Sequence, residues 1–304
     1  MHTLPLGVTF FERGWLSSNN ILIQDENNAI LVDSGYWTHA HQTEQLVRQA
    51  LKNRPLTRII NTHLHSDHCG GNALLQQQYP NIEISIPSGH AYEVDRWDAD
   101  ALTYIPTGQH CPAFSKTNIL INGESIKIHD MTWRIHSAPG HDPHSIVLFN
   151  EQAKILISAD ALWENGFGVV FPEIEGKQAF DEVACTLQII EELKPTLILP
   201  GHGRAFEDVS GALARARSRL KQFQSAPEKH AAYAAKVLIK FKLLEVQKIS
   251  VDDLYIWAKS CKYLQILQHE HAKQMDFKSW FEANYKSLEK SNACKLENRF
   301  IINI

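Results

Sequence analysis

The residues best suited to chemistry lie in one short stretch, residues 62–71, which reads THLHSDHCGG. It holds three imidazoles and one carboxylate, from His63, His65, Asp67 and His68. Imidazole and carboxylate are groups that bind zinc, iron or manganese in proteins. A surface loop that happens to be rich in histidine is the alternative. Because this spacing should rarely arise by chance in a chain of this histidine content, it favours a metal site.

Short apolar runs precede this loop and the other candidate ligands. Residues 57–61 form a run of strand length directly before the loop, so its ligands would lie at the end of a buried strand. Side chains at the carboxyl ends of strands lie on rigid backbone and point into a common crevice. The pattern recurs where other strand-like runs lead to a potential ligand: residues 132–138 to His141, 155–159 to Asp160, and 196–199 to His202.

The first part of the chain alternates between strand-like and helix-like segments. Strands are predicted at 8–11, 20–23, 29–33 and 82–86, and helices at 38–51 and 72–79. This alternation predicts a mixed α/β sandwich. Further along, Asn122-Gly123 lies between strand-like runs at 118–121 and 125–128. Such a dipeptide between two strands predicts a β-hairpin.

A long segment, residues 88–117, shows no clear period and carries several aromatic residues. Within a compact domain, such a segment is either a lid or binding loop, or a few short helices that cover the core. Its mixture of aromatic and polar groups is typical of a pocket wall. We therefore expect a substrate cleft between this segment and the helices after residue 208, with Tyr104 and His110 as substrate contacts.

The chain becomes helical near residue 208, which predicts a catalytic domain over 1–207 and a helical domain over 208–304. Pro227 suits the first turn of a helix, and Ser250 with the acidic residues after it resembles a capping motif.

Residues 204–248 hold ten Lys and Arg against four Asp and Glu, although the whole chain has a formal net charge of −4. Two interpretations are open. The segment is a solvated helix face, or it forms an anion-binding wall over the metals. Such a wall would accept the acidic end of a thioester or a phosphate backbone.

The composition is that of an ordinary globular protein, with 44% hydrophobic and 21% charged residues. The net charge gives no general reason to expect a nucleic-acid partner. We expect neither a membrane span nor a signal peptide, because no apolar stretch of the required kind occurs. The five cysteines are scattered and never spaced as Cys-x-x-Cys. This usage predicts reduced thiols and a cytoplasmic location.

Taken together, the motifs resemble the metallo-β-lactamase superfamily, in particular its glyoxalase II-like hydrolases. The resemblance rests on five motifs in order across residues 1 to about 207: Leu31-Val32-Asp33-Ser34-Gly35, residues 63–68, Pro139-Gly140-His141, Ser158-Ala159-Asp160 and Pro200-Gly201-His202-Gly203. It implies an αββα metallo-β-lactamase sandwich that is followed by a helical region of the winged-helix type.

The resemblance also implies a role for each motif residue. One divalent metal would be held by His63, His65 and His141, a second by Asp67, His68 and His202, and both would be bridged by Asp160. Asp33 would orient the ligand loop without binding metal. Two zinc ions are expected, with iron or manganese as alternatives. True β-lactamases of this superfamily often have a cysteine in place of Asp160, so a β-lactam substrate is not expected.

These roles predict a dinuclear hydrolase that attacks an ester, thioester or lactone carbonyl with a metal-bridging hydroxide. Asp67 would orient the hydroxide or carry its proton, which makes it the candidate catalytic residue. Two alternatives share the fold: an RNase Z-like or β-lactamase-like endonuclease, and a persulfide dioxygenase with a single iron. We expect a small-molecule substrate, no membrane and no nucleic acid, and the sequence leaves the oligomeric state open.

Overall fold

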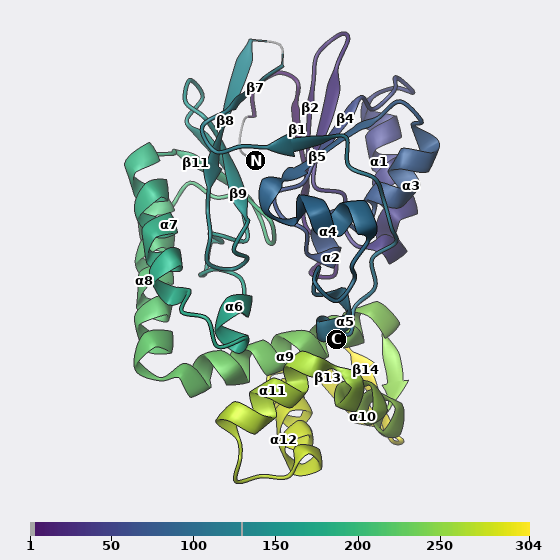
Figure 1. Cartoon of the computed structure of the whole chain (residues 1–304), viewed down its shortest axis with the longest axis vertical. Helices are drawn as coiled ribbons and strands as arrows, with labels where there is room; N and C mark the ends of the chain where they lie inside the picture. Colours follow the sequence, from purple (N-terminus) through teal and green to yellow (C-terminus); the bar gives the residue numbers. More distant parts are fainter. Residues whose placement is uncertain (1–3, 129) are drawn as a thin grey trace.

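The computed structural model describes residues 4–128 and 130–304, and two β-sheets face each other in its N-terminal part (Figure 1). The first sheet has the order β1-β2-β3-β4-β5-β6. Its strands are β1 (Val8–Phe11), β2 (Asn20–Gln24), β3 (Ala29–Val32), β4 (Arg58–Ile60), β5 (Glu83–Pro87) and β6 (Asn118–Leu120). From β3 to β6 the strands run parallel, so their carboxyl ends lie at one edge.

The second sheet has the order β11-β10-β9-β8-β7. Its strands are β7 (Ser125–Ile128), β8 (Met131–Ser137), β9 (Ile146–Asn150), β10 (Ile155–Ala159) and β11 (Leu197–Pro200). Neighbouring strands are antiparallel except β10 and β11, which run parallel. The ends of β8, β10 and β11 therefore deliver the three segments that hold predicted ligands.

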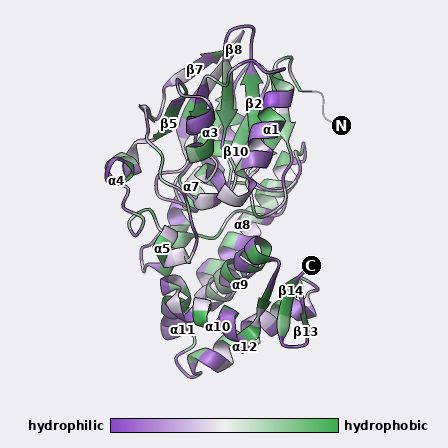
Figure 2. Ribbon diagram, turned by 90° about the vertical axis from the view of Figure 1, so that its right-hand side faces the viewer, coloured by the Kyte–Doolittle hydropathy of each residue, from purple (hydrophilic) through white to green (hydrophobic). Residues whose placement is uncertain are grey.

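A shared layer of apolar side chains holds the two sheets together. Ile23 and Val32 from the first sheet and Trp133 and Leu148 from the second are each at most 2% exposed within it. Figure 2 shows the strands of this region largely in the hydrophobic colour. Helices cover the outer faces: α1 (Ala40–Ala50), α3 (Asn72–Gln78) and α4 (Ala91–Arg96) on the first sheet, and α7 (Phe180–Leu193) and α8 (Val209–Ser225) on the second. The predicted αββα sandwich is confirmed.

The prediction of a β-hairpin at Asn122-Gly123 is wrong. A turn is present, but β6 pairs with β5 in the first sheet, whereas β7 pairs with β8 in the second. Leu120 and Ile126 both belong to the layer between the sheets, so the turn carries the chain from one sheet to the other. An Asn-Gly turn reverses the chain locally, but packing at a distance decides which strand becomes the partner.

Residues 88–117 form short helices over the core. Besides α4, they contain η2 (Ser88–His90) and α5 (Tyr104–Thr107). Val94, Leu102 and Tyr104 are at most 3% exposed and join the cluster on the outer face of the first sheet. Of the two interpretations, short helices that cover the core describe most of the segment.

The C-terminal region combines helices with a small antiparallel sheet. The helices are α9 (Pro227–Val246), α10 (Val251–Ser260), α11 (Lys262–His271) and α12 (Phe277–Lys290). The strands β12 (Lys248–Ser250), β13 (Cys294–Glu297) and β14 (Phe300–Asn303) have the order β12-β14-β13. Helices that end in a hairpin paired with an earlier strand give the winged-helix type of arrangement that the resemblance implied.

Two of the predicted helix starts are confirmed, and one is shifted. Pro227 occupies the first turn of α9, and Ser250 Oγ accepts a hydrogen bond from Asp253 N–H at 3.0 Å at the start of α10. The helix predicted from residue 38 instead begins at Ala40. It follows a 3-10 turn, η1 (Trp37–His39), and no side chain caps it.

The helical part begins within the sandwich. Leu213 and Leu220 on α8 share a cluster with Leu156 on β10. The separate C-terminal cluster starts with α9, which contributes Leu238 and Leu243. Between residues 4 and 304, position 129 excepted, no helix has both the length and the apolar character that crossing a membrane requires.

Candidate active site

The predicted ligands converge at the edge where strands of both sheets end. The loop after β4 and the short helix α2 (Ser66–Cys69) supply four of them: His63, His65, Asp67 and His68. The segments after β8, β10 and β11 supply the others: His141, Asp160 and His202. Apart from Asp67, each is at most 9% exposed.

Three imidazoles form a first group. Nδ1 of His65 lies 3.0 Å from Nε2 of His63 and 2.8 Å from Nε2 of His141. The main chain orients His141, because its Nδ1 donates to the carbonyl oxygen of Val169 at 2.6 Å. Since Nδ1 carries the proton, Nε2 of the neutral ring presents a lone pair to the group.

Asp67, His68 and His202 form a second group beside the first. Oδ2 of Asp67 lies 3.0 Å from Nε2 of His202 and 3.9 Å from Nε2 of His68. Within each group the potential ligand atoms lie within 4.8 Å of one another. This spacing allows each group to share one ion.

Asp160 lies between the two groups. Its Oδ1 is 3.4 Å from Nε2 of His68 and 3.8 Å from Nε2 of His202, whereas its Oδ2 is 3.4 Å from Nε2 of His141. One carboxylate oxygen thus faces each group, which is the position of a bridging ligand. Gly201 permits this position, since a Cβ there would lie 2.3 Å from Oδ1 of Asp160.

Asp33 lies behind the ligand loop. Its Oδ2 accepts hydrogen bonds from Nδ1 of His68 at 2.7 Å and from Oγ1 of Thr62 at 2.8 Å. Its Oδ1 accepts the main-chain N–H of Thr62 at 2.9 Å. The carboxylate therefore fixes the ring of His68 with Nε2 turned toward the site, as an orienting acid does. A φ of 58° places Asp33 in the left-handed region, which is uncommon outside glycine.

Burial and neighbouring charges set the protonation states. Burial, aided by the adjacent imidazoles, lowers the pKa of His63 well below its ordinary value and that of His65 to about 4. Burial also lowers the pKa of His141. Burial alone would lower the pKa of His68, but the surrounding carboxylates, Asp160 foremost, raise it well above its ordinary value. The first group is therefore neutral near pH 7, which is the form that binds metal.

These side chains fit two divalent cations. Nε2 of His68 is buried and has no hydrogen-bond partner within the described ranges. The close imidazole nitrogens of the first group would be stabilised by a cation between them. Imidazoles combined with two carboxylates suit zinc, iron or manganese.

Comparison with known proteins assigns this geometry to a family. Residues 13–202, more than half of the chain, match the model described as the metallo-beta-lactamase superfamily. The chain belongs to the metallo-β-lactamase superfamily. Together with the two buried groups, this match makes it a metal-dependent hydrolase of the metallo-β-lactamase fold.

Several known proteins resemble this chain in sequence or in structure. It is 27% identical over 216 residues to hydroxyacylglutathione hydrolase of Xanthomonas euvesicatoria pv. vesicatoria (strain 85-10), covering 69% of this chain and 72% of that one. It is 23% identical over 222 residues to human acyl-coenzyme A thioesterase MBLAC2, covering 65% and 76%. In structure it resembles the metallo-beta-lactamase family protein TTHA1429 of Thermus thermophilus, with a TM-score of 0.60, 16% identity and coverage of 99% and 100%.

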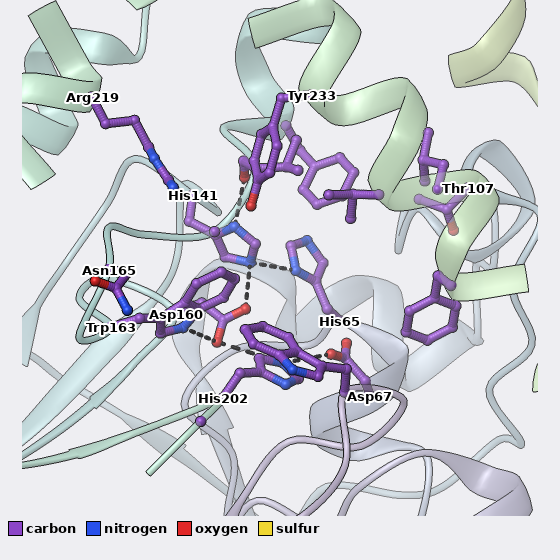
Figure 3. A pocket seen from close by; sticks show the side chains of 18 of the residues that line it. His65, Asp67, Thr107, His141, Asp160, Trp163, Asn165, His202, Arg219 and Tyr233 are labelled. Carbon is purple, nitrogen blue, oxygen red and sulfur yellow. Dashed lines mark hydrogen bonds and ion pairs between the residues drawn. The ribbon is translucent and has the colours of Figure 1, made fainter. Parts of the chain in front are cut away.

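The metallo-β-lactamase site lies at the floor of a cavity of about 610 Å³ (Figure 3). Five of the seven predicted ligands line it: His65, Asp67, His141, Asp160 and His202. Thr107 and Gln109 reach it from the segment 88–117, and Tyr233 and Phe241 reach it from α9. The expected cleft between that segment and the later helices is therefore present, although only the end of the segment contributes to it.

The two predicted substrate contacts lie elsewhere. Tyr104 is 3% exposed, and its hydroxyl lies 3.3 Å from Sγ of Cys69 in the core of the first sheet. His110 is exposed and packs edge-on against Trp37, with ring centroids 5.0 Å apart. Neither residue lines the cavity. The large ring of Tyr104 is buried in the core, so the smaller, more polar Thr107 lines the cavity instead.

Two tryptophans that contact the ligands were not predicted. Nε1 of Trp163 donates to Oδ1 of Asp160 at 3.2 Å. Trp15 stacks on the ring of His202, with centroids 5.3 Å apart and planes at 4°, and is itself 55% exposed. Trp163 stands three residues after Asp160, and this proximity was a usable signal. Trp15 lies far from every motif, so only the fold brings it to the site.

Proposed function

We propose that this chain hydrolyses the thioester, or the related ester or lactone, of a small organic acid. The observation that carries the proposal is the pair of buried groups of potential ligands, with Asp160 between them, at the floor of a cavity. Two relatives support a thioester in particular, since they are named as a hydroxyacylglutathione hydrolase and an acyl-coenzyme A thioesterase.

The chain's own residues would divide the work as follows. Two divalent cations, when bound, would act as Lewis acids and lower the pKa of water at the site. The hydrogen bonds from His141 to Val169 and from His68 to Asp33 hold the rings that bind them. Asp67 lies on the cavity wall with its side chain 14% exposed, so Oδ2 can accept a proton from water that approaches the substrate.

The cavity wall suits an acyl group. Phe171, Val237, Leu238 and Phe241 present apolar surface above the ligands. A pocket of this size and lining takes up a small molecule, whereas an RNA strand requires an extended basic track. This difference favours the carbonyl hydrolase over the endonuclease alternative.

The second ligand group bears on the iron alternative. A mononuclear dioxygenase needs one metal-binding group, whereas Asp67, His68 and His202 are also brought within ligand distance of one another. A dinuclear hydrolase would use this second group, whereas a mononuclear dioxygenase would not need it. The second group therefore supports the proposal.

A substrate panel tests the proposal. Metal-loaded protein is incubated with acyl thioesters, aryl esters, lactones and single-stranded RNA, and an Asp160→Ala variant serves as the control for contaminating activity. Hydrolysis of thioesters by the wild type alone is the expected result. Cleavage of RNA without hydrolysis of any acyl substrate would refute it.

A further inference from the structure

One arginine in the cavity wall has no acidic partner among the described residues. Arg219 on α8 lines the cavity and is half-buried, and no ion pair joins it to a carboxylate in the described part of the chain. Its neighbours differ, because Arg204, Arg215 and Arg217 pair with Glu164, Asp208 and Glu191 respectively. Arg219 is thus the cavity arginine whose charge the protein leaves uncompensated.

The fold holds Arg219 in a defined place. A Cβ at Gly166 would lie 2.5 Å from Nη1 and 2.7 Å from Cζ of Arg219, so the guanidinium packs directly against the backbone of this loop. Gly166 also has a φ of +119°, which favours glycine. On another side, Cζ of Arg219 lies 5.5 Å from the ring centroid of Tyr233. The guanidinium is therefore positioned by the loop and by an aromatic ring.

This position is close to the proposed metal centre. The loop that touches Arg219 at Gly166 touches His141 two residues later, since a Cβ at Gly168 would lie 2.3 Å from Nδ1 of His141. Two residues of extended chain span at most about 7 Å. Figure 3 shows Arg219 and the hydroxyl of Tyr233 on the His141 side of the cavity, with Thr107 on the opposite side. A group bound by Arg219 would thus lie in the same cavity as the reacting carbonyl, on the side of His141.

Tyr233 can assist Arg219. Burial raises the pKa of its phenol, so the hydroxyl keeps its proton at neutral pH and can donate a hydrogen bond. Eight residues later on α9, about 12 Å along the helix axis, Phe241 lines the apolar part of the cavity. The cavity therefore has a cationic end and an apolar end, with the ligand groups at its floor.

We propose that Arg219, with Tyr233 beside it, binds an anionic group of the substrate, a carboxylate or a phosphate, in the same cavity as the scissile carbonyl. This inference rests on the proposed function and narrows its substrate class to anionic thioesters or esters. A planar guanidinium suits both anions, because it can donate two parallel hydrogen bonds to either.

Matched thioesters test the proposal in metal-loaded protein. S-butyryl-N-acetylcysteamine is neutral, S-succinyl-N-acetylcysteamine has a carboxylate on the acyl side, S-butyryl-3-mercaptopropionate has it on the thiol side, and a 3-phosphonopropionyl thioester replaces the carboxylate by a phosphonate. The wild type should hydrolyse at least one anionic substrate about tenfold or more faster in kcat/KM than the neutral one. Arg219→Gln should abolish this preference, because kcat/KM for the anionic substrate should fall, chiefly through KM, by a larger factor than for the neutral one.

Two further variants separate charge from structure. Arg219→Lys keeps the charge without the planar fork and should retain part of the preference. Arg217→Gln removes a charge from the same helix outside the cavity and should change nothing. Equal loss on all substrates in Arg219→Gln would indicate a structural role and overturn the proposal, as would a wild type without any preference for an anion.

A binding measurement distinguishes failure of this inference from failure of the proposed function. Calorimetry compares non-hydrolysable ketone analogues of the four thioesters, in which CH₂ replaces sulfur. If an anionic analogue binds more tightly than the neutral one through Arg219, but no thioester is hydrolysed, then the proposed reaction is wrong and the anion site stands. If Arg219→Gln leaves the relative affinities of the analogues unchanged, the anion site is wrong whatever the enzyme hydrolyses.

Discussion

Asp67 is the most exposed of the predicted ligands, with 14% of its side chain accessible. It is paired with His202 on one side, and the cavity lies on the other. A side chain in that position can serve as metal ligand and as proton acceptor at once, whereas the fully buried His68 can serve only as a ligand.

Replacing Asp67 by Ala should therefore lower kcat/KM by about 10²- to 10⁴-fold, the range expected for loss of a positioned acid or base. The fold should survive, since the side chain makes no contact within the apolar layers. Steady-state kinetics on the best thioester and circular dichroism of the same sample check this. Near wild-type turnover in Asp67→Ala would contradict the assignment.

His230 links the cavity loop to the helical part. Its Nε2 accepts the main-chain N–H of Val170 at 3.1 Å, and burial, with a smaller effect from His271, lowers its pKa to about 4. Below about pH 6.5 the unfolded chain would bind a proton at this position that the folded chain does not bind. The neutral ring of His230 therefore favours the folded state at high pH. As the pH falls from about 6.5 toward 4, the free energy of unfolding decreases by at most about 3 kcal/mol through this residue.

His230→Gln should flatten that dependence, because its side-chain oxygen can accept the same N–H without titrating. Urea unfolding of wild type and variant at pH 7.5, 6 and 5 measures the difference. The exposed His269→Gln is a control that should follow the wild type. Parallel curves for wild type and His230→Gln would show that His230 does not carry the effect.

Residue types and strand ends made it predictable from sequence that the candidate ligands would converge. The carboxyl ends of the adjacent parallel strands β10 and β11 meet at one edge, which brings Asp160 and His202 together. His63 follows β4 of the other sheet and joins them because the two sheets face each other. Trp15 carried no such signal and reaches the site through the packing of a surface loop. Arg219 belongs to the basic stretch 204–248, for which an anion-binding wall was one interpretation, but composition alone does not show which of its cations faces the cavity.

At the scale of elements, local sequence signals predicted where helices and turns begin better than they predicted which strands pair. Ser250 caps α10 as its neighbours in the sequence suggest. Asn122-Gly123 makes its turn, yet the strands on either side belong to different sheets. A cap is satisfied within four residues, whereas a strand partner is chosen by the apolar layer as a whole.

Ser250→Ala should destabilise the protein by about 1 kcal/mol, because the N–H of Asp253 loses its partner at the first turn of α10. Ser260 at the other end of this helix donates only to the carbonyl oxygen of Trp257, so Ser260→Ala is a matched control with a smaller expected effect. Chemical denaturation of the three proteins compares them. An equal loss in both variants would mean that the cap is not what stabilises the helix start.

At the scale of the whole molecule, the C-terminal region helps to form the active cavity. Its first long helix, α9, supplies Tyr233, Val237 and Phe241 to the cavity wall. Tyr36 in the sandwich donates a hydrogen bond to Glu245 of the same helix at 2.9 Å. The change of sequence character near residue 208 was visible, but it did not reveal that α8 completes the sandwich, because an amphipathic helix does not show which apolar surface it covers.

Purified protein should contain close to two metal ions per chain, with zinc expected first. The reason is the division of the ligands into two groups that share Asp160. Elemental analysis measures the content, and removal of metal by a chelator should lower the Tm by roughly 5–10 °C, because ions that bind only the folded chain stabilise it. A single iron per chain, unaffected by His202→Ala, would contradict the dinuclear site.

The ligands are divided between the two sheets, and this division has a consequence for folding kinetics. During synthesis, the strands of the first sheet and the histidines that follow β4 are made well before His202. However, neither sheet alone carries a complete group of potential ligands. All ligands of a metal ion are therefore available only after the two sheets have packed together, late in folding. Interactions that form after the transition state slow unfolding and leave the folding rate nearly unchanged. In stopped-flow experiments with and without metal, the ions should slow unfolding and leave the refolding rate nearly unchanged. A metal-dependent refolding rate would show instead that the ions already bind in the transition state for folding.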